Sequence, residues 1–293
     1  MTQLSDGLSG LRPCLGATVE VGDSGLTVPN PVVDIRLPGV PGNFVADSDR
    51  AILSVDDVGT FAIAHGERIC LDPVPGVTAA VVQGWLNGTV AALLLAQRRC
   101  FALHASVIDI GGSGIALSGQ RGAGKSTTAL RLTQSGHPLV TDDVSPLDTG
   151  DPVTVHPFGR PLHVSPDTAA DLGIDLAEAG PILPGHAKHA LPIPPRPALP
   201  IAAIAVLGTD DAATSVHAVR IRGMNAHGMV SRNIYRGGFL RALWQNEMFT
   251  WSATVAAKVA VYELTRPPRG WTVEAVAEAV ENIARQTQSS TPL

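Results

Sequence analysis

Aromatic side chains are scarce in this chain, making up 4% of its 293 residues. A core built mainly from aromatic rings is therefore excluded, and we expect one filled by Ala, Val, Leu and Ile. Charged residues are also few, at 16%, whereas 45% of the residues are apolar. This balance excludes extended disorder. The chain is long enough to bury a substantial core, as one large domain or two smaller ones.

Cysteine pairs and an excess of positive charge are lacking as well. The three cysteines are widely spaced and form no CxxC pair, which argues against zinc and predicts reduced thiols in the cytoplasm. The formal net charge is −5, without a dense Lys/Arg stripe, so nucleic acid is not expected as a partner. The N-terminal segment has no positive stretch followed by an apolar run, so no secretory signal is expected.

One uncharged stretch, Val77–Ala96, is about long enough to span a bilayer. Polar residues such as Gln83 interrupt it, and no aromatic belt flanks it. We therefore expect a buried helix, broken near Asn87-Gly88, and no membrane as a partner.

The chain alternates between short apolar runs and segments rich in Gly and Pro. Two runs flank Gly111-Gly112-Ser113, a spacing typical of a β-hairpin. Seven prolines fall between positions 181 and 200, which argues against a regular helix or central strand there and suggests a spacer or a flap. Strands are expected at 32–35, 51–55, 61–63, 67–71, 107–110, 114–118, 138–140, 201–207 and 258–264, and helices at 77–97, from 126 and from 273.

Residues Gly119–Thr127 satisfy the pattern G-x-x-x-x-G-K-[ST] in full, between an apolar strand and a helix. Phosphate oxygens need several converging backbone N–H groups, so the chain must curl tightly, which Gly122 and Gly124 permit. Lys125 can reach the β- and γ-phosphates, and the Ser126 hydroxyl can bind Mg²⁺. The motif predicts ATP or GTP binding without separating an ATPase, a GTPase and a kinase. The expected nucleotide-binding residues are Gly119, Arg121, Gly122, Ala123, Gly124, Lys125, Ser126 and Thr127.

An acidic pair, Asp142-Asp143, follows the apolar strand that comes after the helix of this phosphate-binding loop (P-loop). A carboxylate at the end of a strand beside a P-loop can complete the magnesium shell, and a second one can accept a proton from a hydroxyl. An acidic turn or a helix N-cap is the structural alternative. His104 precedes the hairpin that delivers the loop, and its residue type alone leaves a buried structural imidazole and an active-site group equally open.

Three segments together resemble the catalytic domain of the HPr kinase/phosphorylase family. They are Leu-His-Ala-Ser-Val-Ile-Asp-Ile at 103–110, the P-loop, and Gly-His-Pro-Leu-Val-Thr-Asp-Asp at 136–143. The His, the P-loop and the Asp-Asp pair have the family's order and similar spacing. The likeness is greatest to HPr-kinase-like proteins of peptide-modification systems, including lasso-peptide clusters. It is strongest over 103–145 and weaker over 50–285.

The resemblance implies an α/β fold. It places a P-loop core of the HPr kinase/phosphoenolpyruvate carboxykinase type at 101–293, and a smaller N-terminal α+β region that could bind a partner at 1–100. Asp142 matches the family's proton-accepting aspartate and His104 its supporting histidine. Lys125 and Ser126 match the phosphate and metal positions, and Asp143 has a metal or orienting role. The expected catalytic residues are Asp142, His104 and Lys125, and the expected metal ligands are Ser126, Asp143 and Asp142.

The activity implied is an ATP- and Mg²⁺-dependent kinase of a serine-type hydroxyl on a peptide or protein, cytoplasmic and able to form homo-oligomers. Thr127 stands where the bifunctional enzymes usually carry Glu, and their later signature segment is missing, which weighs against HPr as the substrate and against the reverse reaction. Two alternatives stay open: a kinase of a free small molecule such as an amino acid, and a nucleotide-binding regulatory module without transfer activity.

Several other basic residues are candidates for contacts to phosphate. Arg160 follows a strand-like run, and Lys188 lies in the proline-rich stretch. Arginines can clamp transferring phosphoryl groups or an acidic peptide, although exposed arginines on a solvated surface are at least as common. The arginines that crowd the segment after Leu207 are Arg220, Arg222, Arg232, Arg236 and Arg241.

Overall fold

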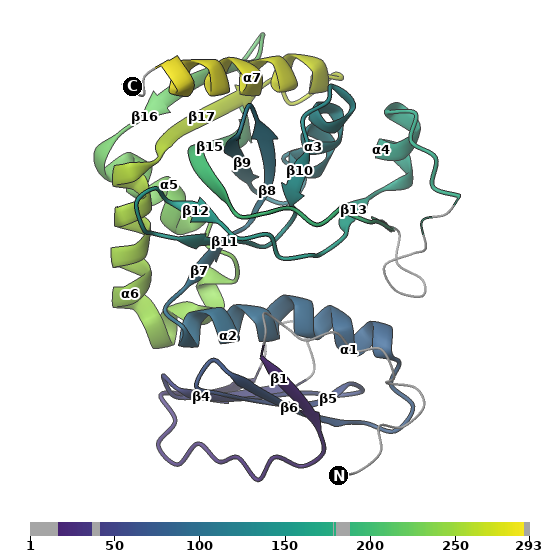
Figure 1. Ribbon diagram of the computed structural model, residues 1–293, viewed down its shortest axis with the longest axis vertical. Coiled ribbons are helices and arrows are strands. Elements are labelled where there is room, and N and C mark those ends of the chain that lie inside the picture. Colours follow the sequence, from purple (N-terminus) through teal and green to yellow (C-terminus); the bar gives the residue numbers. More distant parts are fainter. Residues whose placement is uncertain (1–16, 37–41, 178, 180–187, 290–293) are drawn as a thin grey trace. The chain divides into compact units, whose positions relative to one another are not determined.

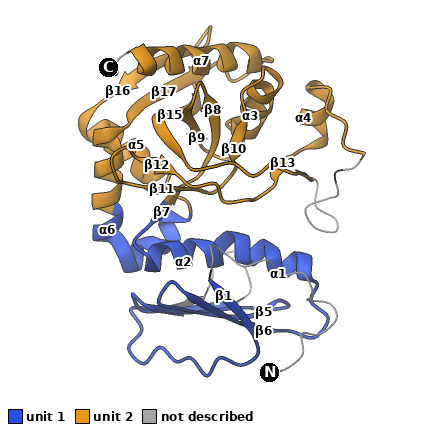
Figure 2. Cartoon of the chain, viewed as in Figure 1, with its two compact units in different colours: residues 1–101, 236–248 blue, residues 102–235, 249–293 orange. Residues whose placement is uncertain are grey.

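The computed structural model describes residues 17–36, 42–177, 179 and 188–289. The chain divides into two compact units (Figure 2). Unit 1 comprises residues 1–101 and 236–248, and unit 2 comprises residues 102–235 and 249–293. The sequence suggested a single boundary at residue 100, whereas in the structure residues 236–248 belong with the N-terminal unit.

Unit 1 is built on a six-stranded sheet in the order β1-β6-β5-β4-β3-β2, with β1 parallel to β6 and the other neighbours antiparallel. Four of its strands cover the runs expected from the sequence, and β1 and β3 were not expected. Alternate residues of β4 are buried, as in a sheet with one covered face. The strands are β1 (Thr18–Val21), β2 (Val33–Arg36), β3 (Gly42–Ala46), β4 (Arg50–Val55), β5 (Gly59–Ala64) and β6 (Arg68–Pro73).

The uncharged stretch of unit 1 forms α1 (Ala79–Trp85), a π-helical turn (Leu86–Val90) and α2 (Ala91–Gln97). The expected break is confirmed, because Gly88 has non-helical backbone angles (φ −109°, ψ −106°). By length and composition Ala79–Gln97 could cross a membrane, but every residue of α2 is buried within the protein. A core helix passes the same test, so this stretch is weak evidence for a membrane span.

Unit 2 contains a nine-stranded mixed sheet in the order β10-β8-β9-β15-β12-β11-β7, with β17 pairing with β15 and β16 with β17. The expected hairpin joins β8 to β9, and Gly111 and Gly112 both have positive φ (63° and 82°), as its tight turn requires. The strands of the sheet are β7 (Phe101–Leu103), β8 (Ala105–Ile110), β9 (Ser113–Gly119), β10 (Leu139–Thr141), β11 (Ser145–Asp148), β12 (Thr154–Val155), β15 (Leu199–Thr209), β16 (His217–Ile221) and β17 (Ala260–Arg266).

Within the proline-rich stretch the structure describes residues 188–200, and strands occur near both ends of this range. A separate pair consists of β13 (Leu162–Val164) and β14 (His189–Leu191), and β15 already begins at Leu199. The expectation that no central strand enters 181–200 is therefore wrong at its end, where Pro200 precedes the buried part of β15. Residues 181–187, on which the idea of a flap depended, lie outside the described residues.

The helices of the described chain include three that the sequence did not reveal, α4, α5 and α6. The longest of them, α6, carries a kink at Trp244 (φ −132°, ψ 36°) and contributes residues to both units. A mixed α/β architecture, as expected, is confirmed (Figure 1). Beyond unit 1 the helices are α3 (Lys125–Gln134), α4 (Pro166–Asp171), α5 (Gly223–Arg232), α6 (Gly237–Lys258) and α7 (Val273–Ser289).

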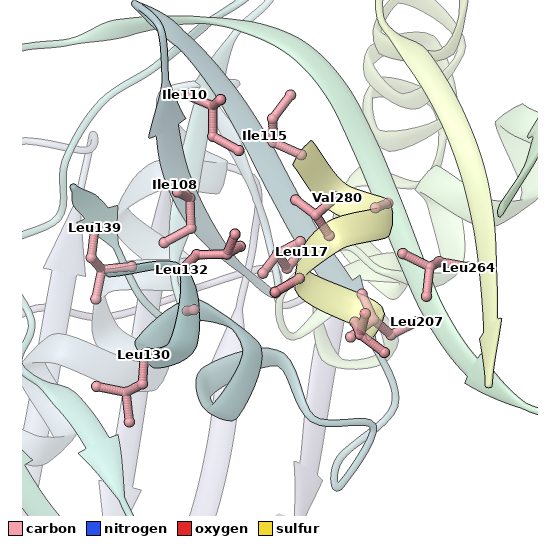
Figure 3. Packing of buried hydrophobic residues seen from close by; sticks show 14 of the residues in the cluster. Ile108, Ile110, Ile115, Leu117, Leu130, Leu132, Leu139, Leu207, Leu264 and Val280 are labelled. Carbon is pink, nitrogen blue, oxygen red and sulfur yellow. The ribbon is translucent and has the colours of Figure 1, made fainter. Parts of the chain in front are cut away.

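The main core of unit 2 lies between one face of its sheet and the helices α3 and α7 (Figure 3). Leu117 of β9 is in register with Ala205 of β15, which is in register with Tyr262 of β17, and all three are buried. The small side chain in the central strand leaves room for α7, which places Val280 against the sheet. This packing fixes where β9 ends and where α3 begins.

Candidate functional site

The P-loop connects the end of β9 to the start of α3. Gly122 and Gly124 have left-handed backbone angles (φ 85° and 101°), and Gly124 is the residue that precedes the first turn of α3. A side chain is disfavoured in this conformation, so glycine allows the tight curl. The loop thus leads into the N-terminus of a ten-residue helix, where unpaired amides and the helix dipole favour phosphate oxygens.

Gly119 is restricted by space as well as by its backbone. Its φ is 133°, and a Cβ atom there would lie 2.5 Å from the carbonyl oxygen of Leu207. We expect Gly119→Ala to lower the free energy of unfolding by about 3 kcal/mol or more, because strain and a backbone clash add. Gly122→Ala should cost only about 1–2 kcal/mol, since no atom lies within 4 Å of its Cβ position. Urea denaturation would compare the two, and equal losses would contradict the clash.

Lys125 is the first residue of α3 and is 9% exposed. Its Nζ donates to the carbonyl oxygens of Gly119 at 2.9 Å and Gln120 at 3.3 Å, so the ammonium lies inside the curl of the loop. Burial lowers the pKa of this ammonium, and the carboxylates of Asp143 and Asp142 act in the opposite direction. The buried ammonium of Lys125, held by two loop carbonyl oxygens, is well placed to bind an incoming phosphate.

Asp142 follows β10 and is 3% exposed. Its Oδ1 accepts from the Ser106 hydroxyl at 2.5 Å and lies 3.4 Å from the Ser126 hydroxyl of the P-loop. Because β10 and β9 are both antiparallel to β8, their carboxyl ends lie at the same edge of the sheet. Burial raises the pKa of Asp142, and the Ser106 hydrogen bond acts against this rise.

Asp143 points to a different set of partners and is more accessible, with 28% of its side-chain surface exposed. Its Oδ1 lies 3.0 Å from His104 Nδ1, and its Oδ2 pairs with Arg160 Nη1. Burial alone would raise the pKa of Asp143, but the hydrogen bond from His104 and the charge of Arg160 hold it well below its usual range. The two neighbouring carboxylates therefore lie in different environments. Asp142 is buried against two hydroxyl groups, whereas Asp143 is ionised between His104 and Arg160.

The comparisons with known proteins centre on this same segment. A family model described as HPr Serine kinase C-terminal domain matches residues 95–160, a range that holds His104, the P-loop, both aspartates and Arg160. Over these residues the chain is HPr-kinase-like. The resemblance to HPr kinases predicted from three short segments is thereby confirmed over this range, and the greater likeness to proteins of peptide-modification systems stays a prediction.

The curated relatives match within a limited region. The HPr kinase/phosphorylase of Lacticaseibacillus casei (strain BL23) is 33% identical over 102 residues, covering 31% of each chain. That of Exiguobacterium sp. (strain ATCC BAA-1283 / AT1b) is 49% identical over 55 residues, or 18% of each chain. The matches therefore span about a third or less of the length of these curated relatives.

A solved structure gives a looser match. The structure titled "Structure of the Hpr(Ser) kinase/phosphatase from Coxiella burnetii" covers 64% of this chain and 96% of its own, with 14% sequence identity and a TM-score of 0.35. The HPr-kinase-like likeness therefore rests on the sequence matches at 95–160.

The oxygen atoms beside the P-loop of this HPr-kinase-like segment fit Mg²⁺. The candidate ligands are the carboxylate of Asp142 and the hydroxyl of Ser126, with Asp143 next to them. Among the described residues no group of three or more His, Cys, Asp or Glu side chains could hold a metal ion. Magnesium sites commonly use one or two carboxylates and take their remaining ligands from phosphates and water, so the donor set suits Mg²⁺ bound together with a nucleotide.

The structure separates the basic candidates. Arg160 is brought to Asp143, whereas Arg220 and Arg232 line two other grooves of unit 2. Lys188 is near enough for its charge to lower the pKa of Lys125. Arg121 is exposed at the rim of the loop.

Ser106 is a site residue that sequence reasoning missed. Its hydroxyl donates to Asp142, which is 36 residues away in the chain. The signal was present, because residues 104 and 106 are two apart in an extended segment and such residues share a face. Thr127, in contrast, turns its hydroxyl toward Thr168 of α4 at 3.4 Å, a contact that the sequence did not suggest.

Proposed function

We propose that this chain is an ATP- and Mg²⁺-dependent kinase that transfers the γ-phosphoryl group to a serine-type hydroxyl on a peptide or protein. The observation that carries the proposal is the pair of carboxylates at the P-loop. Asp142 lies 3.4 Å from the P-loop Ser126 hydroxyl, and Asp143 lies between His104 and Arg160. Phosphoryl transfer depends mainly on positioning and electrostatic stabilisation, and this arrangement offers both.

The phosphate end of the nucleotide would be held by the chain's own charges and amides. The loop amides and the start of α3 bind the phosphate oxygens, and Lys125 neutralises charge on the β- and γ-phosphates. Lys188 adds a second positive charge near Lys125. When bound, Mg²⁺ would neutralise charge that develops on the phosphate oxygens.

The two aspartates divide the remaining work in a way that differs from the sequence-based expectation. P-loop enzymes hold magnesium with the P-loop hydroxyl and an aspartate that follows a neighbouring strand. Asp142 contacts Ser126 and is almost fully buried, so we assign it to the metal. Asp143 is the more accessible carboxylate, so we assign it, in place of Asp142, to the acceptor hydroxyl.

The chemical step exchanges one phosphorus–oxygen bond for another. The acceptor oxygen forms a bond to the γ-phosphorus, the bond from that phosphorus to the β–γ bridging oxygen breaks, and ADP leaves. The acceptor proton moves to the Asp143 carboxylate. His104 and Arg160 keep this carboxylate ionised and oriented. The lowered pKa of Asp143 makes its carboxylate a weak base. A weak base suffices because the transition state is loose, so the acceptor hydroxyl loses its proton late in the reaction.

A peptide or protein acceptor is supported by the curated relatives that match part of this chain, which are named HPr kinase/phosphorylase. The test incubates the protein with labelled ATP, Mg²⁺ and three acceptors: serine-containing peptides, HPr and free serine. We expect phosphoserine on a peptide or protein, located by mass spectrometry. Transfer to free serine alone would replace the peptide by a small acceptor, and hydrolysis of ATP without any transfer would overturn the kinase proposal.

A further inference from the structure

A groove of about 180 Å³ lies directly beside the P-loop, within unit 2. One wall is formed by the loop and the first turn of α3, and the other by the end of β17, the connection to α7 and the first turn of α7. Its lining includes Gly122, Thr127, Thr128, Arg266, Trp271 and Val276. None of the groups assigned above to the chemical step lies in this groove.

The sheet topology places the groove on the side of the P-loop away from the acidic pair. Strand order runs β10-β8-β9-β15, and β17 pairs with β15. Strands β9, β15 and β17 are parallel, so Gly119 and Arg266 lie at the same carboxyl edge of the sheet. Asp142, after β10, flanks β9 from the other side. Ligands of such sheets bind at the carboxyl edge, and here that edge offers two positions separated by the P-loop.

The two positions on either side of the P-loop determine how a bound nucleotide would be oriented. The γ-phosphate must lie toward Lys125 and Asp143, where transfer takes place. The remainder of the molecule then extends past the first turn of α3, where Thr127 and Thr128 line the groove. The groove is smaller than the about 300–1,000 Å³ of pockets that enclose whole drug-sized ligands, so it suits a single ring system.

Trp271 gives the groove an aromatic wall. Its side chain is 50% exposed and lines the groove. Its Nε1 donates to Glu274 Oε1 at 3.2 Å, which ties the indole to the first turn of α7. The Arg266 guanidinium also lines the groove and donates to the Pro267 carbonyl oxygen at 3.1 Å.

We infer that the base of the nucleotide binds in this groove and stacks on Trp271, with the ribose and α-phosphate passing Thr127 and Thr128. The inference rests on the proposed use of ATP and adds the residue that holds its base. Every base has a π-face, so an aromatic side chain and a nearby cationic guanidinium suffice to bind it without a hydrogen-bond pattern. Because the indole is half exposed, the base would be held at the rim of the protein.

The test compares ATP with inorganic tripolyphosphate, both with Mg²⁺, by isothermal titration calorimetry. Losing a stacked aromatic side chain changes affinity for a base about 5- to 150-fold. Trp271→Ala should therefore weaken ATP binding by about tenfold or more and leave tripolyphosphate binding unchanged. Trp271→Phe should restore most of the ATP affinity. Phe249→Ala is the matched control, because Phe249 is also exposed (56%) but packs its ring against His227.

The outcomes separate this inference from the proposed function. If the wild-type protein binds tripolyphosphate and ATP, and Trp271→Ala binds ATP as tightly as the wild type does, the base lies elsewhere and the P-loop assignment still stands. If Trp271→Ala weakens both ligands equally, the side chain acts on the loop and the stacking role is wrong. If the wild-type protein binds neither ligand, the proposed kinase activity fails first, and this inference with it.

Discussion

Replacing Asp143 with Asn is expected to lower kcat for phosphoryl transfer about 100- to 10,000-fold, the usual contribution of a general acid–base group. The affinity for ATP with Mg²⁺ should change little, because Asp142 and Ser126 provide the metal position. Asn also suits the backbone, since Asp143 has a positive φ of 67° and Asn tolerates this conformation better than most residues. Quenched-flow transfer assays and calorimetric binding would measure the two quantities separately.

Asp142→Asn provides the contrasting variant. If Asp142 holds the metal, its loss should raise the Mg²⁺ concentration needed for half-maximal activity by at least about 10- to 100-fold, the loss that follows when only an outer partner of a metal ligand is removed, in addition to slowing transfer. Asp148→Asn is the control, because Asp148 is an exposed carboxylate outside the site, and its Oδ1 accepts a hydrogen bond from the Gly150 amide. Full transfer by Asp143→Asn, with loss of transfer but a normal Mg²⁺ requirement in Asp142→Asn, would reverse the roles and restore the sequence-based assignment.

The parts of the site that follow from local sequence could be predicted. A P-loop needs glycines, a lysine and a hydroxyl at fixed spacing, so the pattern at Gly119–Thr127 identified the turn and the start of α3. The β8–β9 hairpin followed from Gly111-Gly112 in the same way. The break at Gly88 was also local, because glycine weakens a helix wherever it stands.

The rest depends on contacts between distant parts of the chain. Asp143 meets His104 from 39 residues away and Arg160 from 17, and no spacing rule states which of two adjacent carboxylates turns to which partner. Helix α6 was missed although its buried residues recur at helical spacing, because apolar residues such as Phe249 also lie on its exposed side and a kink at Trp244 interrupts it. Its first half also belongs to unit 1, a pairing that depends on tertiary packing and leaves no periodic signal.

Trp271, in the groove beside the P-loop, is a further residue whose proposed role could not be predicted from the sequence. Trp271 lies 144 residues after Thr127, and only the parallel pairing of β9, β15 and β17 brings the two segments to one edge of the sheet. In the sequence Trp271 stands in a Pro/Gly-containing connection without a motif. A base-binding position could therefore be found only from the fold.

Replacing Lys125 with Met is expected to reduce transfer about 100- to 1,000-fold, as does the loss of one preorganised group that stabilises transition-state charge. The ammonium is buried and already held by two loop carbonyl oxygens, so its position is set before phosphate arrives. Lys258→Met is a matched control, because Lys258 Nζ also donates to two carbonyl oxygens, those of Thr149 and Gly150, at 3.0 and 2.9 Å.

The Lys258→Met control separates two effects of a lysine: its positive charge at the phosphate and the stability that its hydrogen bonds to carbonyl oxygens provide. Both variants lose a pair of carbonyl contacts, and thermal melting would report the structural cost of each change. Only Lys125→Met should lose transfer and bind tripolyphosphate weakly. The result that would count against the phosphate role is Lys125→Met with wild-type transfer and a lowered melting temperature. In that case the ammonium would serve only to close the loop, and the charge stabilising the transferring group would have to come from elsewhere, with Lys188, whose charge acts on the pKa of Lys125, as a candidate.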